Sequence, residues 1–370
     1  MKLFNNSDNF DLKQWNFLDE TISNKINNDN QVKTLLDKLI LVSKKIYKRI
    51  YIGASYLTIG ILLLIAAFVY YELVEFDTKL KITLVFAVIG TLFSAFGFIY
   101  IYLSMRLKKN KNMGEDYQFA QYLVESNFIS STYQLFFDKY YNDNNVSDFN
   151  ISIINYVAEK DIYNEEPHKC WSEKKQLEYN ENLNSFSLLY KDHKLKFMIN
   201  KTKKFIYEVI TTDSKGNVHR TKKIDYIQSA AIFLNNDKHE DDYIGIQISK
   251  KKSKKDNYQT ESIYFNNHFS INVNSSDIRG AKFLTPKYID SFENIDSNGF
   301  NKVEIIKNYF YSDWWVFNKD KETKIINDEL CALKNKNYLK IDDFKINLIK
   351  KITYDFELFT KLFSWVKNIY

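Results

Sequence analysis

Two long uncharged runs near the N-terminus constrain this chain more than any other feature. Residues 50–71 read IYIGASYLTIGILLLIAAFVYY and residues 82–105 read ITLVFAVIGTLFSAFGFIYIYLSM, and neither run contains Asp, Glu, Lys, Arg or His. A helix needs about 20 apolar residues to cross the hydrocarbon core of a bilayer. A buried core helix is the alternative, but two adjacent runs bracketed by charge favour spans. Because only residues 72–81 separate them, we predict an antiparallel transmembrane hairpin.

Basic residues outside both runs set the expected orientation, because an excess of Lys and Arg marks the cytoplasmic side of short loops. The chain has two cysteines, Cys170 and Cys331, which are too few for a disulfide framework and favour a reducing compartment. Residues 1–15 lack an apolar core and predict no secretory signal peptide. We therefore expect a two-pass protein of the cell membrane with cytoplasmic termini. The flanking basic residues are Lys33, Lys38, Lys44, Lys45, Lys48 and Arg49, then Arg106, Lys108, Lys109 and Lys111.

Small residues recur every seven positions within both runs. A seven-residue repeat keeps one stripe of a helix facing a partner, and small residues there let two backbones approach closely in lipid. The two spans could pack on each other through these stripes, or one stripe could mediate oligomerisation. The predicted helix-packing residues are Gly53, Gly60 and Ala67 in the first run, and Thr83, Gly90, Gly97 and Ser104 in the second.

The segments around the hairpin show helical periodicity. Residues 31–49 place apolar side chains along one face and lysines on the other, so this helix either continues into the first span or lies on anionic lipid head groups at the cytoplasmic face. Residues 1–30, rich in Asn and Asp, are expected to be loosely ordered. Residues 113–150 predict one or two post-membrane helices, followed by a polar loop at 142–150.

Residues 151–370 are expected to form a cytoplasmic α+β domain, with a mainly antiparallel β-sheet and flanking helices. Short runs of β-type residues begin near residue 185, and Ser214–Asn217 suits a hairpin turn. Residues 303–317 predict two further strands, with Ser312 and Asp313 near the turn. The C-terminal segment returns to helical spacing at Phe356, Phe359, Phe363 and Val366. The expected strands are 185–190, 194–199, 204–212, 218–224, 230–234, 243–249, 261–265 and 268–273.

One of only two prolines lies in the stretch FLTPKYIDSF, residues 283–292. Thr285 is a good N-cap and Pro286 suits the first helical position, so the proline is explained as a helix start. Tyr288, Ile289 and Phe292 would then face the sheet. Just upstream, Ser276 is expected to cap a short turn of helix.

The segment YFNNHFSINVNSSDIRGAKFLTPKYIDSF, residues 264–292, resembles a bacterial family known as domain of unknown function 3137. Members of that family have a two-span hairpin near the N-terminus and then a cytoplasmic domain, so the resemblance implies the same architecture here. It implies no activity, because none is established for the family. The matching positions are Phe265 and Phe269 of an F-x-x-x-F-x-V-like strand, then Asp277, Arg279, and the helix-opening Leu284, Thr285 and Pro286.

Motifs that carry chemistry are scarce in the sequence, and we predict no catalytic residue, cofactor or metal site. No phosphate-binding loop, G-x-S-x-G or H-E-x-x-H motif occurs. His168 and Cys170 form one ligand pair without a second, and the acidic run 237–242 suits a solvated turn better than a divalent cation. The lysine run 250–255 could touch anionic lipid or nucleic acid, but a net charge of +6 is mild and no nucleic acid is expected. The aromatic residues that could line a pocket, or else form core, are Tyr309, Phe310, Tyr311, Trp314 and Trp315.

These observations leave two leading functional hypotheses. The first is a membrane-anchored interaction or scaffold module that binds a protein partner or forms a homo-oligomer at the inner face. The second is a two-span effector of a bacterial defence-type system that oligomerises and disrupts the membrane on sensing a ligand. An enzyme is a third hypothesis, because missing motifs do not exclude an unfamiliar active site.

Overall fold

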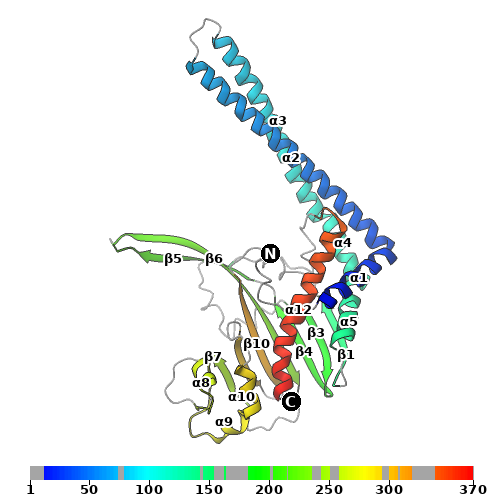
Figure 1. Ribbon diagram of the computed structural model, residues 1–370, viewed down its shortest axis with the longest axis vertical. Helices are drawn as coiled ribbons and strands as arrows, with labels where there is room; N and C mark the ends of the chain where they lie inside the picture. Colours follow the sequence, from blue (N-terminus) through cyan, green and yellow to red (C-terminus); the bar gives the residue numbers. More distant parts are fainter. Residues whose placement is uncertain are drawn as a thin grey trace. The chain divides into compact units, whose positions relative to one another are not determined.

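The computed structural model is shown in Figure 1. Its contacts divide the chain into two compact units, which we describe separately. The first comprises Asp19–Ser126 and Leu333–Ile346, and the second Met1–Leu18, Asn127–Ala332 and Asn347–Tyr370. The structure describes residues 12–73, 79–141, 145–153, 162–163, 182–200, 203–214, 216–235, 243–250, 258–293, 300–306, 309–318 and 338–369.

The hairpin unit contains the two longest helices of the described chain. Helix α2 (Asn30–Leu73) runs without interruption from the amphipathic segment into the first apolar run, so the two predicted helices are one. Helix α3 (Lys79–Met113) follows, and then α4 (Glu115–Glu125). The prediction of a loosely ordered N-terminus was wrong for helix α1 (Leu12–Asn28), and residues 1–11 lie outside the described residues. Buried Ile22 and Ile26 supply the apolar face that holds this Asn-rich helix in place.

The small residues of α2 and α3 meet along the hairpin. A Cβ added at Gly60 would lie 2.7 Å from the carbonyl oxygen of Gly90, and one added at Gly97 would lie 2.8 Å from that of Gly53. These distances are too short for any side chain, so the two backbones touch where the glycines face each other. Ala67 and Ser104 are also buried. The seven-residue stripes are thus used inside a single hairpin.

The remaining surface of the hairpin is apolar and exposed. Both helices are long and apolar enough to cross a membrane, and only 17% and 11% of their most apolar segments are buried. A core helix of a soluble protein would be mostly buried instead. Side chains such as Leu62, Phe68 and Phe98 point outward, with exposed fractions of 59%, 67% and 64%.

The second unit is built on a ten-stranded sheet with the order β1-β3-β4-β6-β10-β9-β7-β8, in which β5 pairs with β6 and β2 with β5. All pairs are antiparallel except β2 with β5. Together with the two long apolar helices, this sheet and its helices confirm the predicted α+β fold class. The strands are β1 (Val146–Ile153), β2 (Ile162–Tyr163), β3 (Asn182–Tyr190), β4 (His193–Asn200), β5 (Lys203–Thr212), β6 (Val218–Asn235), β7 (Gln247–Lys250), β8 (Phe269–Ile271), β9 (Phe300–Ile306) and β10 (Tyr309–Asn318).

Four local predictions in this unit were wrong. Residues 261–265 are not a strand but lead into helix α8 (Ile263–His268), because the Ser262 hydroxyl accepts from the backbone N–H of Phe265 and caps it. Segments 218–224 and 230–234 are one strand, since β6 pairs with β5 at its start and with β4 and β10 further on. Ser312 and Asp313 lie inside β10 rather than at a turn. Residues 146–150, predicted to lie in the polar loop 142–150, instead begin β1. Phe149 is held there because its ring stacks on that of Phe137, with the ring centroids 4.1 Å apart.

Helices α5 (Phe128–Tyr140) and α12 (Ile341–Ile369) cover one face of the sheet (Figure 1). The aromatic stripe predicted near the C-terminus forms this core, because Phe356 and Phe359 contact Phe186 of β3 and Phe359 contacts Phe197 of β4. Tyr133 of α5 adds a ring contact to Phe186 at 5.7 Å. The helices and the sheet are therefore joined through large aromatic surfaces.

A buried charged group lies within this apolar layer. Asp355 is fully buried and accepts hydrogen bonds from the Tyr133 hydroxyl at 2.7 Å and from the Lys351 ammonium at 2.5 Å. A buried charge is tolerated only when it is paired and hydrogen-bonded. Burial, and then the negative charge of Asp355, raises the pKa of Tyr133 well above its ordinary value of 10.0.

We predict that Gly60→Leu disrupts the hairpin, because the Gly90 carbonyl oxygen and the Ser94 backbone nitrogen, each 2.7 Å from an added Cβ, cannot move aside. The free energy of unfolding in mixed detergent micelles should fall by about 1–3 kcal/mol, as for other overpacked sites. The matched control is Ala54→Leu, six residues away on the exposed face of α2. Equal losses in the two variants would contradict the packing described.

We predict that Tyr133→Phe lowers the stability of the sheet unit by about 1.5–3 kcal/mol at neutral pH, the usual cost of a hydrogen bond to a charged group. Because the folded-state pKa of Tyr133 is raised, its protonated form contributes stability below pH 10 that is lost as pH rises further. The free energy of unfolding, measured by chemical denaturation from pH 8 to 11, should therefore decrease less steeply with pH in the variant than in the wild type. Tyr264→Phe, at a half-buried tyrosine of α8, is the control, and a profile identical to wild type in Tyr133→Phe would refute the assignment.

Candidate binding site on the open face of the sheet

The two faces of the sheet differ in chemistry because side chains alternate along each strand. In β4, Leu195, Phe197 and Ile199 are buried in the aromatic core, whereas Lys194 and Lys196 are exposed on the opposite face. The same alternation places Phe233 of β6 on the open face and its neighbours Ile232 and Leu234 in the core. The open face is therefore a mixed surface of cations and apolar groups.

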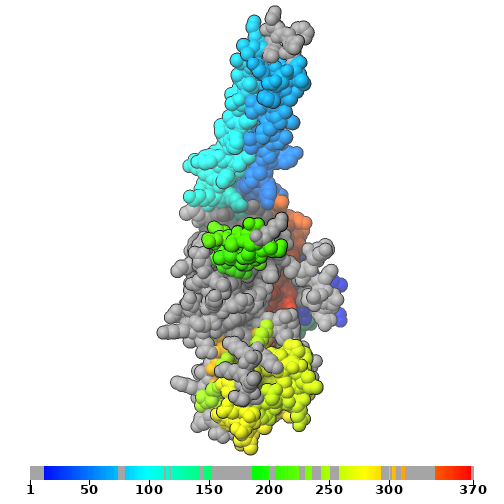
Figure 2. All heavy atoms as spheres, turned by 90° about the vertical axis from the view of Figure 1, so that its left-hand side faces the viewer, coloured from blue at the N-terminus to red at the C-terminus, as the bar shows by residue number. Residues whose placement is uncertain are grey.

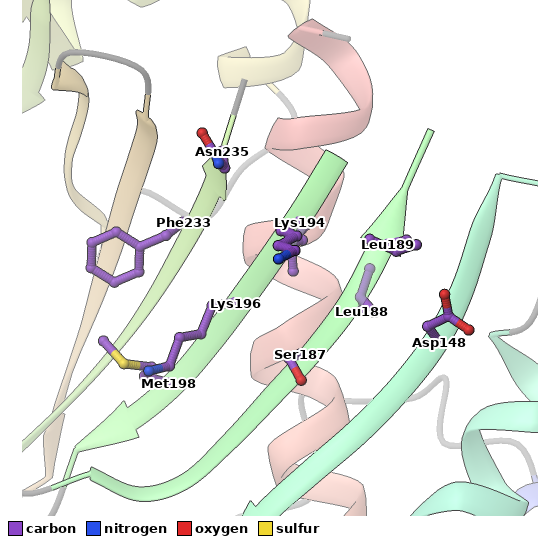
Figure 3. Close-up of a pocket in the computed structure, with 10 residues that line it drawn as sticks. Asp148, Ser187, Leu188, Leu189, Lys194, Lys196, Met198, Phe233 and Asn235 are labelled. Atoms are coloured by element: carbon purple, nitrogen blue, oxygen red, sulfur yellow. The ribbon is translucent and has the colours of Figure 1, made fainter. Parts of the chain in front are cut away.

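A cavity of about 800 Å³ lies on this open face, across strands β1, β3, β4 and β6 (Figure 3). Its volume is within the range of small-molecule sites. Two cations, Lys194 and Lys196, stand beside the apolar groups Met198 and Phe233. The lining residues are Asp148, Ser187, Leu188, Leu189, Lys194, Leu195, Lys196, Met198, Phe233 and Asn235.

A β-bulge shapes the β1 side of the cavity. The pairing of β1 with β3 shifts between Ser147 and Asn150, and Asp148 has a positive φ of 52°. Asp is one of the few residues other than Gly that adopts this conformation readily. The extra residue lets Phe149 turn into the core while Asp148 stands on the cavity side, as Figure 3 shows. This carboxylate is the only acid among the lining residues that the structure describes.

A row of side chains continues from the cavity across four strands. The register pairs Lys196 with Phe233, Phe233 with Tyr311, and Tyr311 with Glu304. The rings of Phe233 and Tyr311 lie 4.8 Å apart. At the far end, the Lys302 ammonium lies 2.7 Å from Glu304, so that charge is neutralised locally. The net positive charge therefore remains at the β4 end of the row.

This arrangement suits binding better than bond-breaking chemistry. Apolar groups can hold the body of a ligand while Lys194 and Lys196 attract an acidic group, and neither lysine forms an ion pair with another described residue. Among the residues of the chain that the structure describes, no group of three or more His, Cys, Asp or Glu could hold a metal ion. The described lining also contains no His or Cys that would serve as a base or nucleophile.

The residues that carry the family resemblance lie elsewhere and build a structural cluster. Phe265 lies in helix α8 and Phe269 in strand β8, so the expected single strand was wrong. Both rings contact Phe292 of α10 (Pro286–Glu293), at 5.3 and 5.0 Å, and Phe292 packs on Trp365 of α12 at 4.2 Å. These aromatic groups are core.

The polar members of that segment act as helix caps. Asp277, and not Ser276 as predicted, caps helix α9 (Ile278–Phe283) by accepting from the backbone N–H of Arg279. The Arg279 side chain also pairs with Asp277 at 2.7 Å, and these hydrogen bonds lower the pKa of the carboxyl. Pro286 is the first residue of α10, whose Tyr288 backbone N–H is 3.3 Å from the Thr285 hydroxyl, as the proline interpretation predicts. Leu284 is buried between the two helices.

Several residues considered from the sequence lie outside the described residues. These are His168 and Cys170, the acidic run 237–242, and residues 251–255 of the lysine run. Of the aromatic residues in β10, Phe310 is buried and Tyr311 joins the open-face row, while the side chains of Tyr309, Trp314 and Trp315 are not described.

Sequence reasoning missed the cavity itself. Its residues come from four strands that become neighbours only through pairing, and the bulge at Asp148 has no sequence signature of its own. The alternation of lysine with apolar residues in 194–199 was the one available signal, and it was interpreted only as a strand.

Comparison with protein-family models, with curated proteins and with solved structures finds no match to this chain. The resemblance to domain of unknown function 3137 therefore stays a prediction.

We predict that the cavity binds a small aromatic carboxylate, with naphthoate as the probe. The chain has four methionines, Met1, Met105, Met113 and Met198, so methyl-labelled methionine NMR reports on the site with built-in references. The Met198 signal should shift saturably, and the double change Lys194→Gln, Lys196→Gln should weaken binding about fivefold, as expected for exposed charges. Lys282→Gln, Lys287→Gln is the matched control. Equal shifts at Met105 and Met198, or unchanged affinity in the first variant, would count against the site.

Proposed function

We propose that this chain is a membrane-anchored cytoplasmic interaction module. The hairpin of α2 and α3 tethers the sheet unit to the inner face of the membrane, and the sheet unit binds an acidic, partly apolar segment of a partner through its open face. The observation that supports the anchor is the surface of the hairpin. Its apolar side chains point outward, whereas the glycines of α2 and α3 face each other in the contact between the two helices. The basic flanks of both spans support the cytoplasmic orientation.

The internal use of the glycines is also the reason to prefer a tether to an oligomerising membrane-disrupting effector. Assembly of such an effector was expected to use a stripe of small residues. In the hairpin, Gly53 faces Gly97 and Gly60 faces Gly90, so neither stripe is available to a second copy. An oligomer would have to form through the larger outward side chains.

The residue types that line the cavity favour a binding role over an enzymatic one. Two lysines, one carboxylate and an apolar floor can select a partner by charge and shape. The partner class that fits carries a carboxylate or phosphate next to an aromatic or aliphatic group.

Single-cysteine labelling in intact cells tests the anchor and its orientation. In a background with Cys170→Ser and Cys331→Ser, Glu75→Cys lies in the link between the spans, and Asn217→Cys lies at the turn between β5 and β6. A membrane-impermeant maleimide should label Glu75→Cys in intact cells and Asn217→Cys only after permeabilisation. Labelling of Asn217→Cys in intact cells would overturn the orientation. Protection of Glu75→Cys until permeabilisation would show that the hairpin does not cross.

A further inference from the structure

The hairpin of strands β5 and β6 extends beyond the sheet as a two-stranded ribbon (Figure 1). We call its outer part, residues 207–224, the arm. β5 pairs with β2 only at Phe205 and Ile206, and β6 pairs with β10 only from Tyr226 onward. Along the arm, therefore, each of the two strands pairs only with the other among the described residues. A two-stranded ribbon of this kind is marginally stable alone in water, which calls for something that contacts it.

The tip of the arm is a well-formed turn. Asp213 accepts hydrogen bonds from the backbone N–H and the side-chain amide of Asn217, and Gly216 has the positive φ of 82° that the turn requires. Asp213 also lies 3.3 Å from the His219 ring. The arm is thus a formed hairpin, as the sequence predicted for residues 214–217.

One face of the arm combines aliphatic and basic side chains. Residues that are paired across the ribbon share a face, and the register pairs Ile206 with Ile224, Glu208 with Lys222, Ile210 with Arg220, and Thr212 with Val218. Ile210 and Val218 are each 60% exposed and Ile224 is 46% exposed. Three exposed aliphatic groups share this face with Arg220 and Lys222, so the face suits an apolar environment next to negative charge.

The arm carries a net positive charge. Residues 207–224 contain four Lys or Arg and two acids, one of which is the turn residue Asp213. Arg220, Lys222 and Lys223 are exposed and form no ion pair with any described residue. Lysine and arginine on an open strand edge disfavour pairing with a second strand, and two copies of this face would repel each other. The same residues favour an anionic surface.

We propose that the arm inserts its aliphatic tip into the head-group region of an anionic phospholipid leaflet. Ile210, Val218 and Ile224 would enter the interface while Arg220 and Lys222, on the same face, contact lipid phosphates, with their long stems letting the charges stay at the surface. The inference rests on the proposed function, because a sheet unit tethered at the inner face is held at high effective concentration next to this leaflet. It adds a second membrane contact to the two spans.

The test uses the full chain in lipid nanodiscs, with a spin label at one cysteine in the cysteine-free background. Ile210→Cys reports on the arm, Leu62→Cys on the outer face of α2, and Ile263→Cys on an exposed site of α8 away from the arm. Accessibility to lipid-soluble oxygen and to a water-soluble nickel complex is compared in discs of phosphatidylcholine alone and in discs that also contain phosphatidylglycerol.

We expect the Ile210 label to become oxygen-accessible and protected from nickel only in the anionic discs. Each charge removed in Arg220→Gln, Lys222→Gln should lower the ratio of bound to free arm about fivefold. The matched control Lys282→Gln, Lys287→Gln removes two exposed charges elsewhere and should leave the Ile210 signal unchanged.

The remaining outcomes separate the two proposals. An Ile210 label as water-exposed as the Ile263 label in anionic discs, while the Leu62 label is lipid-exposed, would overturn the arm proposal alone. A Leu62 label that faces water in every disc would overturn the membrane anchor. The Ile210 label could also be protected from nickel equally in both kinds of disc, and lose that protection when each disc holds only one copy of the chain. That result would mean that the arm contacts a second copy, which also contradicts a lipid site.

Discussion

The apolar outer surface of the hairpin is the constraint on which the account of this protein depends. Burial of one large aliphatic or aromatic side chain is worth about 1.5–3 kcal/mol, and α2 and α3 leave many such groups exposed along their spans. Within the described residues nothing covers them, and the glycine stripes show that the two helices have already used their close-packing surface on each other. A bilayer is the environment that removes this cost. The proposed tether of the sheet unit and the proposed lipid contact of its arm both rest on that requirement.

Within the sheet unit, one face of the sheet forms the packed core and the other face carries the candidate binding site. One face is closed by α5 and α12 through aromatic contacts around Phe186 and Phe356, with the buried Asp355 satisfied by Tyr133 and Lys351. That closure fixes the backbone of β3 and β4, and so holds Lys194 and Lys196 in place on the opposite face. In the space-filling view of Figure 2, the arm is the green patch and the segment of α8 to α10 is yellow. The structural cluster and the two candidate contact surfaces are thus made by different segments of the unit.

The sequence was informative where a pattern is local and less so where tertiary pairing decides. The spans, the terminal aromatic helix and the start of α10 at Pro286 follow from hydrophobic period and helix-start chemistry, and all three agree with the structure. Helix α1 was missed because residues 1–30 as a whole are rich in Asn and Asp and the buried face of the helix is narrow. Residues 261–265 were misread because a six-residue helix is too short to show its period. The cavity depends on a bulge at Asp148 and on four strands meeting, and no single segment encodes either feature.

The measurement that tests the central claim most directly is alkaline carbonate extraction of membranes from cells that express the full chain. If α2 and α3 cross the bilayer, the protein stays in the membrane pellet after carbonate and salt washes and is released only by detergent. A chain held merely at the surface, or a soluble chain whose hairpin is covered by another protein, would appear in the carbonate supernatant. That result would contradict the membrane anchor, and with it the assignment of the sheet unit to the inner face.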